Sequence, residues 1–357
     1  MFKLFISQSA LNKIMLNNSD RDEDDFDTWY KIIKKLGCVY TLDDTGSDIE
    51  ALDKDSAQMD VSFLIQQGGT NITDKSDYIT EIINEPQKVL QEPCSAFLLD
   101  IDPSKAQDIQ NKYGVICQST RKLKNNIWTK DYNNSYVNIG QGKNDHSWKD
   151  VFPTDEIPRN SLIIIDRYLF SNYDQGLHNL EEIVSNSMPL TLAKGVNFHV
   201  LLIYDPTKVE NSSVNNFKHL STELNSIKNR IRKEKDFFID FEVLAITKDD
   251  YSYDDTHNRR IISNYFIVSA EHMLKAFSSE GNGLCNQVIN CNTLFSRGLD
   301  TKSKSDMPND THISILENLS SMVDFAQNKS KVALPYSLNG NSNLSISNIK
   351  NRIINCL

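Results

Sequence analysis

Several features that identify common classes of protein are missing from this sequence of 357 residues. Its apolar runs are no longer than a strand, so we expect no membrane-spanning helix, and the opening run Met1–Ile6 is too short for a signal peptide. The six cysteines include no CxxC pair. Their scatter favours reduced thiols in a protein core over a zinc knuckle or a disulfide framework, and a cytoplasmic location is expected.

The chain also lacks an excess of basic residues. It carries 38 Lys and Arg against 48 Asp and Glu, and this net charge of −10 argues against a broad surface that coats nucleic acid. Familiar catalytic signatures are absent too: there is no GxxxxGK[ST] loop, no GxGxxG after a strand, no GxSxG elbow and no HExxH helix. We therefore expect neither a cofactor nor a bound metal ion.

What is present is an alternation of strand and helix patterns, which predicts an α/β fold with two α/β domains. In the N-terminal half, helical spacing and closing glycines separate short apolar runs, and parallel strands joined by helices are the expected outcome. The expected strands there are 3–6, 38–42, 96–99 and 115–117, and the expected helices begin at Ser9, Trp29 and Pro103.

The C-terminal half has the clearest strand signals. The apolar runs Ser161–Ile165 and His199–Tyr204 are typical of strands buried on both faces of a sheet, so Ile163–Ile165 and Val200–Ile203 are expected to be adjacent and parallel. Helices are expected at 177–184, 217–233, 313–326 and 346–354, and further strands at 238–246 and 257–268. We divide the chain into an N-terminal α/β domain (1–155), a second α/β domain (156–310) and a helical extension (311–357).

The most specific spacing in the chain is His257-x-Arg259-x4-Asn264. It resembles the His-x-Lys-x4-Asp motif of the phospholipase D superfamily, which includes lipases, phosphodiesterases and nucleases. The resemblance covers about Ser161 to Phe277 and implies a single mixed or parallel sheet flanked by helices. It also implies a metal-independent site in which His257 attacks phosphorus, Arg259 holds the phosphate oxygens and Asn264 supports them. Arg260 is a further candidate for phosphate contact.

The motif departs from the family pattern at three places. Arg replaces Lys at 259, Asn replaces Asp at 264, and Glu271-His272 stands where the family has Gly-Ser, so a carboxylate replaces a small residue. The motif occurs once, whereas the family builds one site from two copies, so activity would require a homodimer.

Two functions remain open for this half. The first is a catalytically degenerate interaction module, alone or within a larger complex, that binds phosphate, nucleic acid or a protein in a prokaryotic nucleic-acid or anti-phage defence pathway. The second is an active, metal-independent nuclease or phosphodiesterase that uses His257 in a homodimeric site. The departures from the motif favour the first.

The N-terminal half resembles PIN-like ribonuclease domains in its order of elements. In that family, acidic residues at strand ends hold divalent cations, and the matching candidates are Asp43, Asp44, Asp100 and Asp102. Ser7-Gln8-Ser9 stands where the family has its first Asp, which favours a non-catalytic relative. Asp residues after strands also form turns and helix caps, and this alternative stays open.

One basic cluster includes an aromatic residue. Arg121, Lys122 and Lys124 precede Trp128, a combination that can contact a nucleic-acid backbone and stack on a base. The alternative is a solvated loop.

Overall fold

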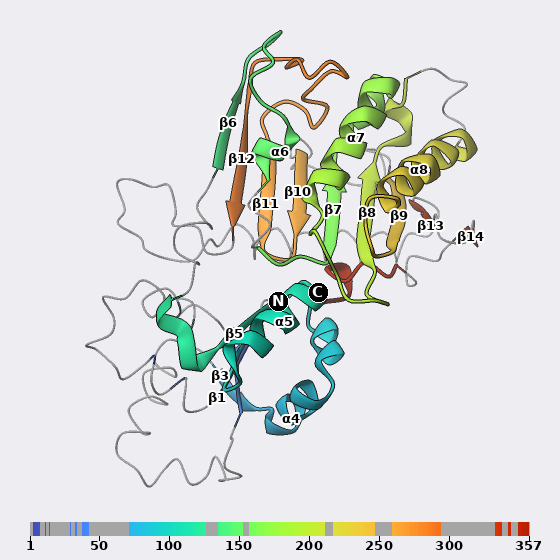
Figure 1. The fold of residues 1–357 in the computed structure, drawn as a ribbon. Helices are drawn as coiled ribbons and strands as arrows, with labels where there is room; N and C mark the ends of the chain where they lie inside the picture. Colours follow the sequence, from blue (N-terminus) through green and yellow to red (C-terminus); the bar gives the residue numbers. More distant parts are fainter. Residues whose placement is uncertain are drawn as a thin grey trace, which may run out of the picture. The chain divides into compact units, whose positions relative to one another are not determined.

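The computed structural model of the chain divides into two compact units, one comprising residues 1–133 with 294–313 and the other residues 134–293 with 314–357 (Figure 1). Each unit contains one sheet with helices, so the predicted α/β class is confirmed. The residues that the structure describes are 3–7, 11, 14, 29, 33, 38–42, 71–125, 135–152, 157–210, 217–246, 259–293, 333–337, 342–343 and 349–356. Every helix among these residues is too short or too polar to cross a membrane.

The first unit contains a five-stranded parallel sheet in the order β3-β2-β1-β4-β5. The order reverses between β1 and β4, as in doubly wound sheets, where ligands bind beyond the carboxyl ends of the strands. The strands are β1 (Lys3–Ser7), β2 (Cys38–Leu42), β3 (Asn71–Asp74), β4 (Ser95–Leu99) and β5 (Ile116–Ser119), and the helices are α4 (Ser76–Asn84), η3 (Pro86–Gln91), α5 (Pro103–Tyr113) and η4 (Thr120–Asn125).

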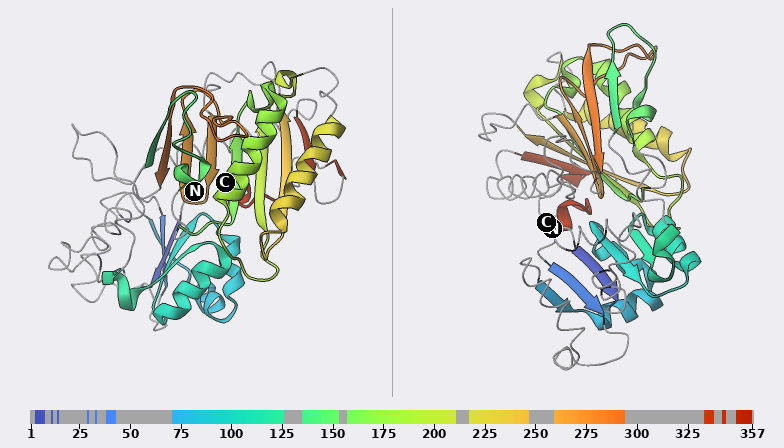
Figure 2. Two further views of the ribbon diagram at one scale, coloured as in Figure 1. Left: turned by 45° about the horizontal axis from the view of Figure 1, so that its top comes forward. Right: turned by 90° about the vertical axis from the view of Figure 1, so that its left-hand side faces the viewer.

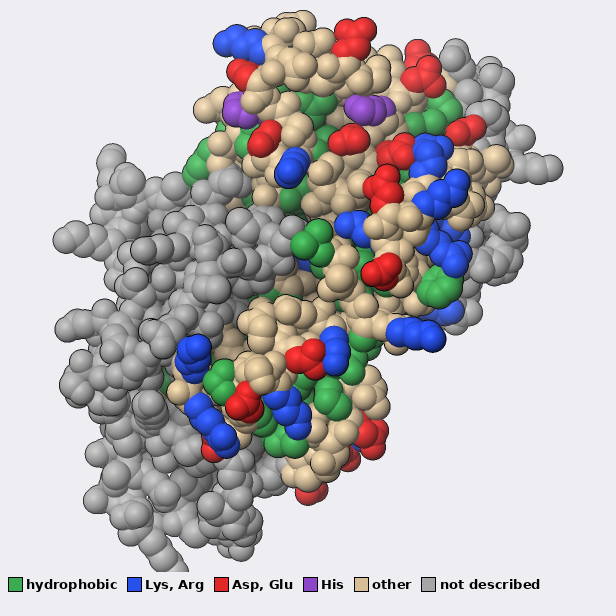
Figure 3. All heavy atoms as spheres, viewed as in Figure 1, with side chains coloured by type: hydrophobic (Ala, Val, Ile, Leu, Met, Phe, Trp, Pro, Cys, Tyr) green, Lys and Arg blue, Asp and Glu red, His purple; other side chains and the backbone are tan. Residues whose placement is uncertain are grey.

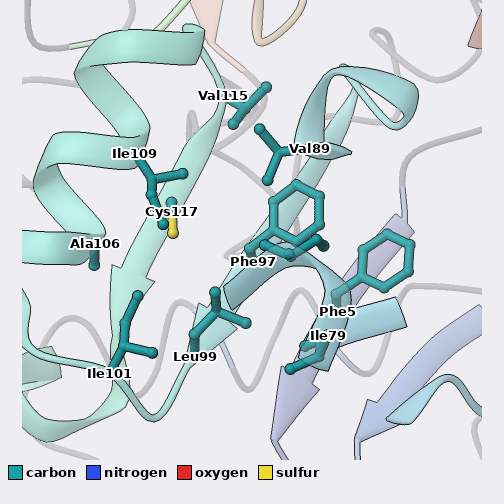
Figure 4. Packing of buried hydrophobic residues seen from close by; sticks show 11 residues of the cluster. Phe5, Ile79, Val89, Phe97, Leu99, Ile101, Ala106, Ile109, Val115 and Cys117 are labelled. Carbon is teal, nitrogen blue, oxygen red and sulfur yellow. The ribbon is translucent and has the colours of Figure 1, made fainter. Parts of the chain in front are cut away.

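Alternate residues of the first sheet form one side of its hydrophobic core (Figure 4). Phe5 of β1 stacks on Phe97 of β4, with ring centroids 5.0 Å apart, and both rings pack with residues of α4 and α5. Helix α5 ends at Gly114, whose φ of 63° lies in the left-handed region that glycine adopts without strain. The strand at 96–99 and the helix beginning at Pro103, both predicted from the sequence, correspond to β4 and α5.

The second unit contains a nine-stranded mixed sheet in the order β14-β13-β9-β8-β7-β10-β11-β12-β6. Its central strands β7, β8 and β9 are parallel, and every other neighbouring pair is antiparallel. The strands are β6 (Ser135–Ile139), β7 (Ser161–Ile165), β8 (Phe198–Tyr204), β9 (Ile239–Ile246), β10 (Arg259–Ser263), β11 (Phe266–Ala270), β12 (Gln287–Thr293), β13 (Ala333–Ser337) and β14 (Ser342–Asn343).

The predicted pairing of the two apolar runs is confirmed. Ile163 of β7 lies opposite Leu201 of β8 in a parallel ladder, and Ile163–Ile165 and Val200–Ile203 are all buried. Such strands are buried on both faces because helices and other chain segments cover both sides of a parallel sheet.

Helices α6 (Trp148–Val151), α7 (Tyr173–Ser187) and α8 (Phe217–Arg232) cover one face of the second sheet (Figures 1 and 2). The indole of Trp148 in α6 donates to Asn179 of α7 at 2.9 Å, and α8 is joined to α7 by the Arg230–Glu181 ion pair. Two short 3-10 helices, η6 (Leu169–Ser171) and η7 (Pro206–Lys208), follow β7 and β8.

The opposite face of the second sheet binds residues 349–356, which end in η10 (Ile354–Cys356). Asn351 is completely buried, accepts a hydrogen bond from the Ser161 hydroxyl and donates to the Leu162 carbonyl. The carboxylate of Glu242 on β9 accepts the backbone N–H groups of Lys350 and Asn351 at 2.7 and 3.0 Å. This segment therefore fastens β7 to β9.

Two assignments made from the sequence differ from the structure. The second unit begins at Asn134, earlier than the expected boundary at 155/156, because β6 pairs with β12. The extension 311–357 is not helical throughout, because β13 pairs with β9 and residues 346–353 contain no described helix; its expected helix at 313–326 lies outside the described residues. Both strands are short, and Pro335 within β13 weakens its strand signal.

Candidate functional site

Charged side chains gather at the carboxyl ends of β7 and β8 in the second unit. Asp166 directly follows β7 and is only 1% exposed. Strand β10 runs antiparallel to β7, so its first residue, Arg259, lies beside Asp166. Lys275 reaches this position from the segment after β11, and Ser171 from η6. We call Asp166, Ser171, Arg259 and Lys275 the edge cluster.

Asp166 is held by backbone hydrogen bonds. Its Oδ1 accepts the N–H of Tyr168 at 2.8 Å, and its Oδ2 accepts the N–H of Leu274 at 3.0 Å. Burial raises the pKa of Asp166, and the two N–H donors and the charges of Arg259 and Lys275 oppose that rise. Because Asp166 binds the residue before Lys275, it fixes the path of the chain after β11.

Arg259 lies between the backbone after β11 and an aromatic ring. Its Nη1 donates to the carbonyl of Glu271 at 3.4 Å, and its Cζ lies 5.9 Å from the centre of the Tyr168 ring. Burial raises the pKa of the nearby Cys285 thiol, while the charge of Arg259 lowers it. A guanidinium can in general bind a phosphate through two N–H groups.

Lys275 donates a hydrogen bond from Nζ to the hydroxyl of Ser171. Both side chains are partly exposed. Burial lowers the pKa of Lys275 and outweighs the carboxylates of Asp166 and Glu210, which raise it. The sequence does not indicate this pair, because Ser171 and Lys275 are 104 residues apart and belong to no shared motif.

A second buried carboxylate is paired at the end of β8. Asp205 Oδ2 accepts Nε and Nη2 of Arg167, both at 3.0 Å, and Oδ1 accepts the N–H of Thr207. This pair adds no net charge beside the edge cluster. It fixes the chain after β8 against the chain after β7.

The three predicted catalytic residues do not come together as one described group. Arg259 belongs to the edge cluster, whereas His257 lies outside the described residues. Asn264 lies about 16 Å from Arg259 along the chain direction of β10, at about 3.3 Å per residue. Its Oδ1 accepts the N–H groups of Asn160 and Ser161 at 3.0 and 3.1 Å, so it holds the turn after β10 against the start of β7.

Two further predicted features of the motif have definite positions. Side chains alternate along a strand, so Arg260 lies on the face opposite Arg259 and outside the edge cluster. Glu271 follows β11, and its carboxylate accepts the N–H of Val288 at 2.9 Å. The negative charge at the Gly-Ser position is thus bound to the backbone of β12.

The acidic residues of the first unit have structural partners. Asp102 caps α5 by accepting the N–H of Ser104 at 2.8 Å, and Asp100 accepts Nε of Arg121 at 2.6 Å. Asp43 and Asp44 lie outside the described residues. Within the described part of the chain, no three His, Cys, Asp or Glu side chains come together as a metal site.

The basic cluster near residue 121 is only partly described. Arg121 and Lys122 are exposed, Lys124 lies in η4, and Trp128 falls outside the described residues. On the face shown in Figure 3, Lys and Arg side chains are interspersed with Asp and Glu rather than gathered in one broad basic patch. The predicted contact of this cluster with nucleic acid stays a prediction.

No protein-family model matches this chain, and no curated protein proves similar to it. The resemblances to phospholipase D and PIN-like families thus rest on the motif and on the order of elements. The geometry at the carboxyl ends of β7 and β8 is the main guide to function.

Proposed function

We propose that the second unit is a phospholipase-D-like module that binds the phosphodiester backbone of a nucleic acid at the edge cluster. The observation that carries this proposal is the position of two cations, Arg259 and Lys275, beside the buried Asp166 at the carboxyl ends of parallel strands. Ligands of α/β sheets bind at this edge. Arg supplies a planar pair of donors for phosphate, and Lys supplies a compact charge.

Binding without turnover by the His257 motif is the favoured form of this function. Asn264 replaces the carboxylate of the family motif, and its amide is used in structural hydrogen bonds. Arg259 replaces the Lys of the motif. A binding module of this kind fits the prokaryotic nucleic-acid or anti-phage pathway, and the homodimer or larger complex, suggested by the resemblance. Buried, reduced Cys94, Cys117 and Cys291 support a cytoplasmic location.

Binding of a fluorescein-labelled single-stranded oligonucleotide, followed by anisotropy, tests the proposal. We expect Arg259→Ala to weaken binding at least tenfold, since a charge-assisted contact to phosphate contributes about 1.5–3 kcal/mol. Arg260→Ala is the matched control, because the same charge is removed from the neighbouring position on the opposite face. If both variants bind as the wild type does, the edge cluster is not the phosphate site.

The alternative function, a metal-independent nuclease, has its own test. An active enzyme would cleave the oligonucleotide in EDTA, and His257→Ala would abolish cleavage. Absence of His257-dependent cleavage in EDTA, at concentrations that bind the oligonucleotide, supports the module. Cleavage in EDTA that depends on His257 would instead show that the protein is a metal-independent nuclease.

A further inference from the structure

We propose that Ser171 is a nucleophile and Lys275 its proton acceptor, so that the edge cluster contains a Ser–Lys pair that attacks the phosphorus of a bound phosphodiester. The choice of substrate class rests on the proposed function. The pair itself rests on the hydrogen bond between Lys275 Nζ and Ser171 Oγ. Neither residue belongs to the His257 motif, so this chemistry is distinct from the histidine mechanism that the motif implies.

Ser171 is held firmly by its neighbours in η6. Leu169 and Phe170, the two residues before it, are buried, and the Ser171 N–H donates to the Tyr168 carbonyl at 3.0 Å. A Cβ at Gly176 of α7 would lie 2.3 Å from the Leu169 carbonyl oxygen, so only glycine lets α7 pack this closely on η6. A nucleophile needs such a fixed position, because a misplacement of about 1 Å costs much of its rate.

Lys275 is positioned from the opposite side of the site. The N–H of Leu274, the residue before it, donates to Asp166, and Gln287 Oε1 accepts the N–H of Met273. The charged groups that face Lys275 are Asp166 after β7 and Glu210 after η7, and both favour its protonated form. Burial opposes them and is the larger effect, which lowers the pKa of Lys275 and suits it to accept a proton.

The reaction balances with these groups alone. Ser171 Oγ forms a bond to phosphorus while its proton moves to Lys275 Nζ, the bond from phosphorus to the leaving oxygen breaks, and Lys275 returns the proton to that oxygen. Water then attacks the phosphoserine ester, gives its proton to Lys275 and displaces Ser171, which regains a proton. Arg259 is the cation available to stabilise the charge on the phosphate oxygens.

A fluorophosphonate probe with a fluorescent tag tests the pair without requiring nucleic-acid binding. Ser171 Oγ would bond to phosphorus, fluoride would leave, and Lys275 would take the proton. We expect the wild-type protein to be labelled, with peptide mass spectrometry locating the adduct on Ser171. Ser171→Ala should abolish labelling. Ser278→Ala is the matched control, since the Ser278 hydroxyl accepts the N–H of Asn282.

Lys275→Arg separates charge from proton transfer, because Arg keeps a cation and donors but does not accept a proton at ordinary pH. We expect labelling to slow at least tenfold in this variant. In the wild type, the labelling rate should rise with pH to a midpoint below 10.5, the ordinary pKa of Lys. Thermal unfolding of each variant shows whether it is folded.

The outcomes separate this inference from the proposed function. A folded wild-type protein without an adduct on Ser171, or a Lys275→Arg variant labelled at the wild-type rate, overturns the Ser–Lys pair. If oligonucleotide binding in the same samples still depends on Arg259, the proposed function stands. If Ser171 is labelled but the protein binds no oligonucleotide, the Ser171–Lys275 pair is supported and the edge cluster is not a site for a nucleic-acid phosphodiester.

Discussion

The carboxyl ends of the parallel strands carry Asp residues in both units, but the two sheets use them differently. Asp100 after β4 forms an exposed ion pair with Arg121, with side chains 43% and 58% exposed. Asp166 after β7 is 1% exposed and binds two backbone N–H groups beside two cations. Exposed pairs are screened by water, whereas a buried carboxylate is costly unless it is paired and hydrogen-bonded. Burial, rather than the presence of an acidic residue, distinguishes the candidate site.

The largest expected effect in this comparison comes from Asp166→Ala. The substitution leaves the N–H groups of Tyr168 and Leu274 without their acceptor and removes the buried carboxylate beside Lys275. We expect a loss of about 3 kcal/mol in the free energy of unfolding, measured by urea denaturation. A loss below about 1 kcal/mol would mean that the buried Asp166 contributes no more to stability than an exposed carboxylate such as Asp100.

Glu242→Gln tests a second buried carboxylate of the same sheet through its dependence on pH. Burial raises the pKa of Glu242 from 4.5 to about 7, so the folded protein binds the proton more tightly than the unfolded chain does. The wild type should therefore lose about 2 kcal/mol of stability relative to Glu242→Gln as pH rises from 5 to 8, given about 1.4 kcal/mol per pKa unit.

Urea denaturation at several pH values measures this difference. Burial lowers the pKa of His199, on the same sheet face, to about 4. The stability that neutral His199 contributes is therefore lost as pH falls below 6.5, whereas the stability that Glu242 contributes is lost as pH rises. The His199 contribution is shared by both proteins and cancels in the comparison. Parallel pH profiles for the wild type and Glu242→Gln would show that Glu242 stays ionised in the folded protein.

Asp102→Ala should have a smaller effect that stays within the first unit. The substitution removes the side-chain acceptor for the Ser104 N–H at the start of α5. We expect faster amide hydrogen exchange in the first turn of α5 and unchanged oligonucleotide binding. Asp102→Asn, which keeps a capping oxygen, is the control and should restore slow exchange. Weakened oligonucleotide binding in Asp102→Ala would assign the phosphate site to the first unit.

Asp100→Ala should have the smallest effect of the four. It removes an exposed partner of Arg121 that water replaces readily. We expect the melting temperature and the oligonucleotide affinity to match those of the wild type. A marked loss of either would show that this strand end has a role equivalent to that of Asp166.

Local patterns predicted much of the fold, and the candidate site only in part. Continuous apolar runs identified β7 and β8, and the motif located Arg259 at the site. The role of Lys275 depends on a hydrogen bond that joins residues 104 apart, so no spacing in the sequence reveals it. Asn264 shows the reverse problem: its motif position suggests the site, while its hydrogen bonds lie at the other end of β10.

The attachment of residues 349–356 to the second sheet has a consequence for synthesis of the chain. The hydroxyl of Ser161 donates to Asn351, a residue that is translated 190 residues later. Until those residues emerge from the ribosome, this face of β7 and β9 lacks the segment that fastens the two strands. The nascent sheet would then expose apolar surface for the time taken to translate that interval, about 10–40 s at 5–20 residues per second, when chaperones can bind it.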